Sequence, residues 1–307
     1  MQRESFLKSA ARYKTMYLFL LPAVILTMIF CYRPMVGVVM AFQDYDIVKG
    51  LYHSDFTGLA NFKEFFQEKY FYQALKNTLG INILSIVIGF PLPIILAIII
   101  FAIRDSIFKR VAQTISYLPH FISWVVVAGL VYRMLDSDSG IVNIVITKLG
   151  GEAVPFMRTP QYFWFIIVFT AIWKELGWNT IIYLAALSGI DAEQYEAAIV
   201  DGANGFQKLI YITLPGIAPT IGLLLIFTIG NLVNANGNVS FDAVFNLRNA
   251  MVSDTANTID YYIYQEGVLG GRMAYSAAVG LAQNMVSLGL VLAANEISRK
   301  MRGYGAF

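Results

Sequence analysis

Long runs of apolar residues dominate the hydrophobic pattern of this 307-residue chain. A helix needs about 20 apolar residues to cross the hydrocarbon core of a bilayer, and six segments qualify. Strict alternation of polar and apolar residues is missing from these runs, and each is much longer than a membrane barrel strand. The pattern predicts an all-α membrane protein with a bundle of six transmembrane helices, at about residues 16–42, 75–103, 111–135, 162–190, 215–234 and 274–297.

Two of the six segments are interrupted by charged residues. Arg33 follows the first apolar run, and Lys174 with Glu175 breaks the fourth. Prolines also fall inside the spans, where neighbouring helices can satisfy the carbonyls that proline frees. We expect these helices to be kinked at their prolines, which are Pro22, Pro91, Pro93 and Pro119.

The composition agrees with a membrane protein. Hydrophobic residues make up 57% of the chain and charged residues 14%, against about 25% charged in an average soluble protein. A formal net charge of +2 argues against nucleic-acid binding, which needs a concentrated basic face. We expect one transmembrane domain over residues 16–297, between tails at residues 1–15 and 298–307.

Lys and Arg positions predict the orientation, because cytoplasmic loops are enriched in them. Basic residues cluster before the first span, between the second and third, and after the last, whereas the alternate loops at residues 43–74, 136–161 and 234–273 are rich in acids. With six spans, both termini should be cytoplasmic. The first apolar run is too long for a signal peptide and has no Ala-x-Ala site after it, so we expect it to be retained.

The sequence has few residues that could form a metal site or a disulfide. The chain has one cysteine, Cys31, and two histidines, His53 and His120, which lie far apart without ligand spacing. We therefore predict no metal site and no catalytic residues. The phosphate-binding pattern G-x-x-x-x-G-K-[ST] is also missing from the sequence.

Residues 191–214, here called the coupling loop, read as two short helices on the predicted cytoplasmic side. Asp191 with Gln194, and Asn204 with Gln207, have the spacing of helix-capping pairs. Gly202 between them can adopt the positive φ that ends a helix. Pro215 then marks the entry to the fifth span.

The coupling loop resembles the "EAA" loop of permease subunits in binding-protein-dependent ABC importers. The match keeps both gaps of the motif and seven residue identities within 20 positions, at Glu196, Ala197, Ala198, Gly202, Ile212, Leu214 and Pro215. The resemblance implies that this loop, Asp201 included, docks into a cleft on a cytoplasmic ATPase subunit. It assigns Glu196 to a basic group of that partner, the two alanines to close helix approach, and Gly202 to the bend. Without the motif, an amphipathic helix lying on the membrane is an equal alternative.

Three further segments resemble the carbohydrate branch of the family, at residues 116–126, 177–191 and 295–307. This resemblance implies a prokaryotic inner-membrane importer of oligosaccharide. Its partners would be a second homologous permease, two ATPase subunits that hold ATP and Mg²⁺, and an extracellular solute-binding protein, with no cofactor on this chain. Asn236–Ser240 looks like a small insertion relative to the family.

Polar and aromatic residues within the later spans are candidates for the substrate path. Charged residues inside a span are costly and tend to face a cavity or a partner. Because adjacent helical positions point about 100° apart, we expect Lys174 and Glu175 not to pair simply with each other. The candidate path residues are Trp173, Lys174, Glu175, Trp178, Asn179, Asn231, Asn234 and Asn284. Interfacial aromatic belts and helix-to-helix hydrogen bonds are the alternative roles for them.

Other function classes stay open at this point. An importer for another small solute would carry the same coupling loop. An ion-coupled carrier would need its coupling residues within this chain, where Lys174 and Glu175 are the internal charged pair. An intramembrane enzyme would need paired Asp residues, a Ser-His set or His-rich ligands within the spans, and none is apparent in the sequence.

Overall fold

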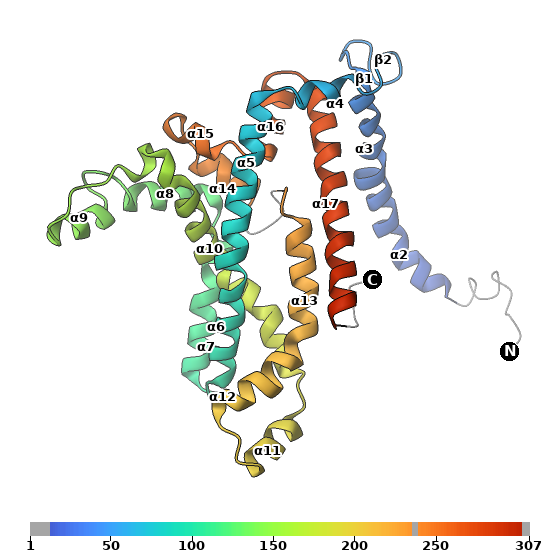
Figure 1. The fold of residues 1–307 in the computed structure, drawn as a ribbon. Coiled ribbons are helices and arrows are strands. Elements are labelled where there is room, and N and C mark those ends of the chain that lie inside the picture. The colour runs from blue at the N-terminus through green and yellow to red at the C-terminus, as the bar shows by residue number, and fades with distance from the viewer. Residues whose placement is uncertain (1–12, 235–238, 303–307) are drawn as a thin grey trace, which may run out of the picture. The chain divides into compact units, whose positions relative to one another are not determined.

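The computed structural model describes residues 13–234 and 239–302, and these are mostly helical, which confirms the predicted fold class (Figure 1). Within those ranges, strands are limited to a short antiparallel hairpin of β1 (Gln43–Asp44) and β2 (Asp55–Phe56). The predicted tails at 1–15 and 298–307, and the insertion at 236–240, lie partly outside the described residues. The α-helices are α2 (Lys14–Thr27), α3 (Arg33–Met35), α4 (Ala60–Phe65), α5 (Lys69–Leu84), α6 (Pro91–Ala102), α7 (Ile107–Tyr117), α8 (Trp124–Met134), α9 (Ile141–Lys148), α10 (Pro160–Ser188), α11 (Ala192–Val200), α12 (Gly205–Lys208), α13 (Leu214–Gly230), α14 (Phe241–Leu247), α15 (Ser253–Ala256), α16 (Ile259–Tyr264) and α17 (Met273–Arg302).

The chain divides into two compact units. The single transmembrane domain over residues 16–297 stays a prediction. Within the described residues, unit 1 comprises residues 13–65 and 266–281, and unit 2 comprises residues 66–234, 239–265 and 282–302. In unit 1, the side chain of Asn61 on α4 donates to the carbonyls of Ala41 and Gln43, at 3.0 and 2.9 Å. This pair of bonds attaches α4 to the start of the hairpin.

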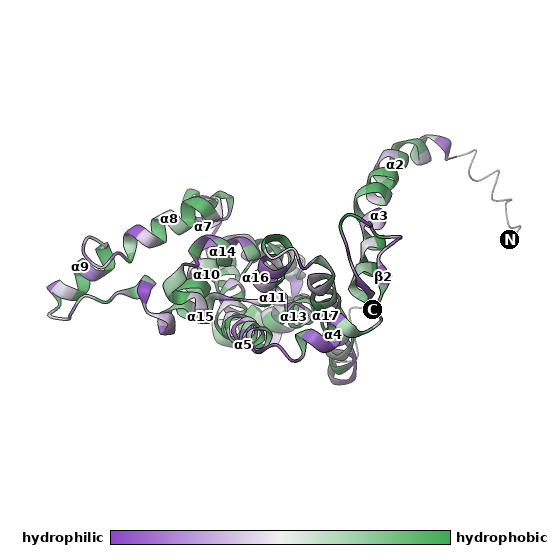
Figure 2. Cartoon of the chain, turned by 90° about the horizontal axis from the view of Figure 1, so that it is seen from above, coloured by the Kyte–Doolittle hydropathy of each residue, from purple (hydrophilic) through white to green (hydrophobic). Residues whose placement is uncertain are grey.

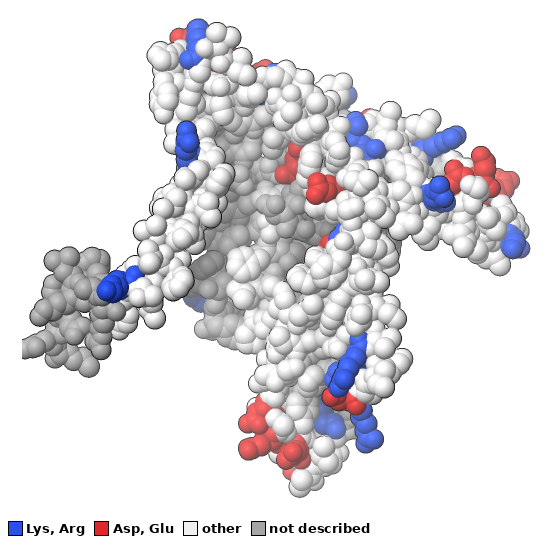
Figure 3. All heavy atoms as spheres, turned by 180° about the vertical axis from the view of Figure 1, so that it is seen from behind, with Lys and Arg blue, Asp and Glu red and all other residues white. Residues whose placement is uncertain are grey.

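Five helices of the described chain are long and apolar enough to cross a membrane, or six if one bent pair is counted as a span. The five are Lys14–Phe42, Lys69–Ala102, Pro160–Ser188, Gly205–Gly230 and Met273–Lys300. Figure 2 shows hydrophobic colour along α2 and α8, and Figure 3 shows broad stretches of surface without charged side chains.

The bent pair falls on the predicted span at residues 111–135, where a kink at Pro119 was expected and a complete break of the helix is found. Ile107–Phe121 and Trp124–Met134 meet at 100°. Pro119 sits in the 3₁₀ turn Leu118–Phe121, Ile122 is extended, and the Ser123 hydroxyl accepts from the Val126 N–H to start a new helix. The apolar run is continuous in sequence, but its backbone is broken because a proline turn and a new N-cap fall in the middle of it.

Three helices widen into a π-helical turn shortly before a proline. These three turns are Met28–Tyr32, Ser85–Gly89 and Leu209–Thr213. Each ends two residues before a proline, namely Pro34, Pro91 and Pro215. A proline ring clashes with the carbonyl four residues before it, and a widened turn relieves that clash while the helix continues.

The core of unit 2 forms around α10. Near one end of α10, a large apolar cluster joins it to α14, and near the other end a smaller cluster joins it to α6 and α13. The first includes Phe163, Ile167, Val168, Ala171, Ala243, Val244 and Leu247, and the second includes Ala97, Tyr183, Leu187 and Ile217. The coupling loop, with α11 and α12, lies at one end of unit 2, and α14 to α16 lie at the other (Figure 1).

Candidate functional site

The coupling loop folds as two short helices whose ends are capped by neighbouring residues. The Asp191 carboxylate accepts from the Glu193 N–H at 3.0 Å and starts α11. Asn204 and Gln207 form a reciprocal capping box at 2.8 and 2.9 Å, which confirms that prediction. The Asp191 side chain bonds to the Glu193 N–H, and not to Gln194 as had been predicted. An Asp at the N-cap can accept from the N–H of either the second or the third helical residue.

The turn between the two helices depends on a left-handed residue. Gly202 has a φ of 74°, which confirms the predicted positive φ. The Gly202 N–H donates to the Ile199 carbonyl at 3.0 Å, and the Ala203 N–H donates to the Ala198 carbonyl at 2.8 Å. A Cβ at Gly202 would meet nothing within 4 Å, so the backbone conformation alone favours glycine here.

The loop exposes apolar as well as charged surface. No residue of α11 (Ala192–Val200) or α12 (Gly205–Lys208) is buried. Val200 is 87% exposed, Phe206 69% and Ile199 60%. In the motif, Glu196, Ala197, Asp201, Gly202 and Pro215 are exposed, and Ala198, Ile212 and Leu214 are partly buried. A structured segment with apolar side chains directed away from its own chain is typical of a binding surface.

Tyr195 connects this exposed loop to the rest of unit 2, and sequence reasoning missed it. Its hydroxyl lies 3.0 Å from the hydroxyl of Thr213, just before α13. Its ring lies 6.4 Å from the ring of Phe101 at the end of α6. An aromatic residue directly before Glu196 was the available signal.

Lys174 and Glu175 do pair with each other, contrary to the expectation from their helical positions. The Lys174 ammonium lies 3.1 Å from one carboxylate oxygen of Glu175. His120, which the sequence did not single out, lies with Nδ1 2.7 Å from the other oxygen. The long side chains of lysine and glutamate bend toward this common partner, so the 100° between their Cβ directions does not keep them apart.

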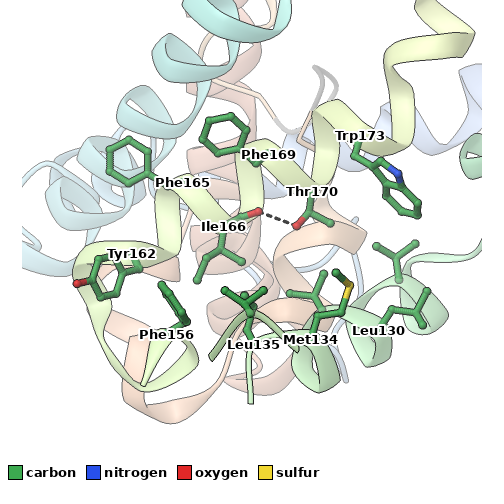
Figure 4. Close-up of a pocket in the computed structure, with 13 residues that line it drawn as sticks. Leu130, Met134, Leu135, Phe156, Tyr162, Phe165, Ile166, Phe169, Thr170 and Trp173 are labelled. Atoms are coloured by element: carbon green, nitrogen blue, oxygen red, sulfur yellow. Dashed lines mark hydrogen bonds between the residues drawn. The ribbon is translucent and has the colours of Figure 1, made fainter. Parts of the chain in front are cut away.

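Trp173 faces a different environment. It lines an open groove of about 490 Å³ between α8, α9 and α10, together with Phe156, Tyr162 and Phe169 (Figure 4). The Thr170 hydroxyl in this groove donates to the carbonyl of Ile166 at 2.7 Å. Because sugar hydroxyls need polar partners, this lining suits an acyl chain or an apolar helix face better than a carbohydrate.

The other predicted path residues do not converge on one site. Asn179 lines a cavity of about 90 Å³ between α6, α10 and α13 with Tyr183 and Thr228. Asn231 follows α13 and is partly buried, whereas Asn234 is buried beside Asn82 of α5. Asn284 on α17 is exposed. Trp178 joins the Lys174 group through its contact with His120.

Across residues 13–234 and 239–302, the structure brings together no group of three or more His, Cys, Asp or Glu side chains that could hold a metal ion. His120 and Glu175 are a pair, and the third member of their group is the cation Lys174. Because these side chains pair with one another, they do not form a set of free metal ligands.

Comparisons with known proteins give consistent results. Residues 89–302 match the family described as binding-protein-dependent transport system inner membrane component. Protein LplB of Bacillus subtilis is 40% identical over 303 residues, covering 99% of this chain and 94% of LplB. The polygalacturonan/rhamnogalacturonan transport system permease protein YteP of the same organism is 39% identical, covering 100% and 94%. A chain in the crystal structure of a bacterial alginate ABC transporter, in complex with a periplasmic protein bound to alginate pentasaccharide, superposes with a TM-score of 0.88 at 39% identity, covering 99% and 100%.

Proposed function

Because this chain belongs to the family of binding-protein-dependent transport system inner membrane components, we propose that it couples the uptake of an oligosaccharide to ATP hydrolysis on a separate subunit. The observation that carries the proposal is the coupling loop. It is folded by its own caps, and it exposes Glu196, Ala197 and the apolar Val200 away from its own chain.

The coupling loop suits a groove on a partner protein. Small side chains at Ala197 and Ala198 let α11 approach a wall closely, and the carboxylate of Glu196 adds orientation at the rim. Val200 and Phe206 supply apolar area at the tip. Closure of two ATPase subunits would then move α10, which ends at Ser188 just before the loop, and α13, which begins at Leu214 where the loop ends.

The carbohydrate cargo is inferred from relatives of similar length. YteP carries polygalacturonan or rhamnogalacturonan in its name, and the superposed transporter chain comes from an alginate importer. Both names describe polymers of sugars, so we propose an oligosaccharide as the cargo of this chain. Of the predicted path residues, we propose Asn179 as a cargo contact, because it lines the cavity between α6, α10 and α13.

We propose that the working assembly contains a second homologous permease, two ATPase subunits with ATP and Mg²⁺, and an extracellular solute-binding protein. The family description supports the binding protein and the inner membrane. The cytoplasmic location of both termini and of the coupling loop is supported by the flanking Lys and Arg residues.

Substitutions at Gly202 test the coupling role. Gly202→Val puts a β-branched residue at a φ of 74°, at a cost of about 1–3 kcal/mol, whereas Gly202→Asn tolerates that region. We expect normal membrane insertion in both variants, with cargo-stimulated uptake at least fivefold lower for valine and near wild type for asparagine. Gly205→Ala, at a site with open space and no positive φ, is the control.

Uptake is to be measured in proteoliposomes that contain the full transporter, beside the ATPase rate with and without loaded binding protein. Full transport by the valine variant would refute the role of the turn. Titrating the cognate binding protein with oligosaccharides and small solutes tests the cargo separately, and binding of a non-carbohydrate alone would exclude the sugar assignment.

A further inference from the structure

The strongest unassigned feature lies where the broken third span meets α10. The Lys174 side chain is only 6% exposed. Its ammonium donates to the backbone carbonyl of His120 at 2.6 Å and to Glu175 at 3.1 Å. Glu175 contacts Nδ1 of His120 through its second oxygen at 2.7 Å. One residue of the 3₁₀ turn before the break is thus held through both its backbone and its ring.

Aromatic contacts close the same group. The His120 ring stacks on Trp178 with centroids 4.3 Å apart and planes 3° from parallel. The Lys174 ammonium lies 5.6 Å from the centre of the Trp124 ring, at the first residue of α8. Both sides of the break, His120 before it and Trp124 after it, therefore contact α10 within one helical turn.

The backbones approach closely at this place as well. Gly177 of α10 is buried, and a Cβ there would collide with the carbonyl of Ser116 on α7. A side chain at this position would push α7 and α10 apart. Glycine is therefore required here for packing, and the polar contacts of Lys174 and Glu175 depend on the short distance that it allows.

We infer that His120, Lys174, Glu175 and Trp178, here called the α10 clamp, position the break of the third span and do not contact cargo. Inside a low-dielectric bundle, a lone ammonium or carboxylate is expensive, and each here has its partner within the same chain. The Lys174 ammonium donates hydrogen bonds to a carbonyl and to a carboxylate of its own chain. Its charge is therefore already paired and is not directed at a ligand.

The α10 clamp also connects α8 mechanically to α10, and through α10 to the coupling loop. α10 runs without interruption from Pro160, beside the apolar groove, to Ser188, next to the coupling loop. Because the clamp fastens α8 and its preceding turn to the middle of this helix, a displacement that reaches α10 from the coupling loop is passed to α8. The wall of the groove then moves with the loop.

Single and double substitutions distinguish a clamp from a cargo contact. Glu175→Gln leaves the buried ammonium of Lys174 without its anion, and we expect uptake to fall at least tenfold. The double variant Lys174→Met/Glu175→Gln removes both charges, and we expect it to recover to within about threefold of wild type. If the residues contacted cargo independently, the double variant would lose at least as much as the two single losses multiplied, and that result would overturn the inference.

A substitution series at His120 supplies a readout that general destabilisation does not reproduce. His120→Asn can keep a donor near the position of Nδ1, whereas His120→Ala cannot. We expect asparagine to restore most of the uptake lost with alanine. Equal loss in both variants, or no loss in either, contradicts a positioning role for His120.

A distance measurement keeps the test independent of transport and therefore of the proposed function. Spin labels at Val125→Cys on α8 and Ile181→Cys on α10, both exposed, are placed in a Cys31→Ser background. In the assembled transporter, we expect one narrow distance distribution for wild type and the double variant, and a broad one for Glu175→Gln and His120→Ala. A narrow distribution in all four proteins would overturn the clamp even if their uptake differed.

Discussion

The coupling loop and the segment from residue 239 to 264, here called the cap segment, lie at opposite ends of unit 2 and differ in how they are attached to it (Figure 1). Side-chain caps of the coupling loop join residues two or three positions apart. The cap segment has local caps as well, at Ser240 and Asn249, but it also receives bonds from α5 and α10, which lie about 90 to 180 positions earlier. No residue of α11 or α12 is buried, whereas Ala243, Val244 and Leu247 of α14 are.

The long-range bonds of the cap segment mainly satisfy backbone groups in its turns. The Asn77 amide donates to the carbonyls of Asp254 and Asn257, both at 2.9 Å. The Trp164 indole donates to the carbonyl of Thr255 at 2.9 Å. A connection that enters a bundle must satisfy its backbone groups there, and side chains of the long helices do so. The cap segment is thus part of the folded bundle, and the coupling loop is an independently capped surface.

The largest effect is expected from Asn77→Ala, which removes a buried amide and its two bonds to the carbonyls of Asp254 and Asn257. Asn77 is 2% exposed, and losing both bonds should cost about 2–4 kcal/mol. We expect a clear drop in the thermal midpoint of the detergent-solubilised protein. Gln73→Ala is the matched control, since it removes an exposed bond to the same Asp254 carbonyl one helical turn away. Equal shifts for both variants would contradict the importance of burial.

An intermediate and purely local effect is expected from Asn204→Ala. Loss of the capping box should destabilise α12 by about 1 kcal/mol without lowering the midpoint of global unfolding. Hydrogen exchange should become faster for the amides of residues 204–208 only. Gln194→Ala is the control, because Asp191 caps α11 through Glu193. Faster exchange throughout α13 would show that the loop is coupled to the bundle more strongly than its contacts indicate.

The smallest effect concerns Asp136, a locally bonded residue between α8 and α9. Its carboxylate accepts from the backbone and hydroxyl of Ser139 and from the Asp138 N–H, and these bonds hold its pKa below the ordinary value of 3.8. A lowered folded pKa means that the stabilisation is complete above the unfolded pKa and is lost as the pH falls through the folded one.

We therefore expect the carboxyl carbon signal of Asp136 to titrate with a midpoint below 3.8, with the turn opening only in more acidic solution. The Ser139→Ala variant removes the hydroxyl donor and should move the midpoint upward. A midpoint at or above 3.8 in the wild type would show that the turn is not formed in the membrane-bound protein. Either way, global unfolding should change little, because this carboxylate is solvent-exposed.

The candidate site was predictable from sequence where its structure is local. The capping box at Asn204 and the positive φ of Gly202 depend on residue types within a few positions, and both are confirmed. The role of Tyr195 as an attachment was not predictable, since its partner Thr213 is 18 residues away. For the same reason, the pairing of Lys174 with Glu175 was not predictable. Its helical positions argued against pairing, but the partner that draws the two side chains together, His120, lies 54 and 55 residues away.

The sequence by itself determined which segments are helical and apolar, where the coupling loop lies and how its helices are capped, because those properties depend on local composition and on hydrogen bonds between near neighbours. The sequence also placed a kink at Pro119, but the size of the bend, 100°, came from the structure. Only the tertiary structure decided that Lys174 and Glu175 pair with each other beside His120, and that Ala243, Val244 and Leu247 of the cap segment are buried. The last two features require groups from distant helices to meet. Such meetings depend on how the helices pack, which no short window of residues specifies.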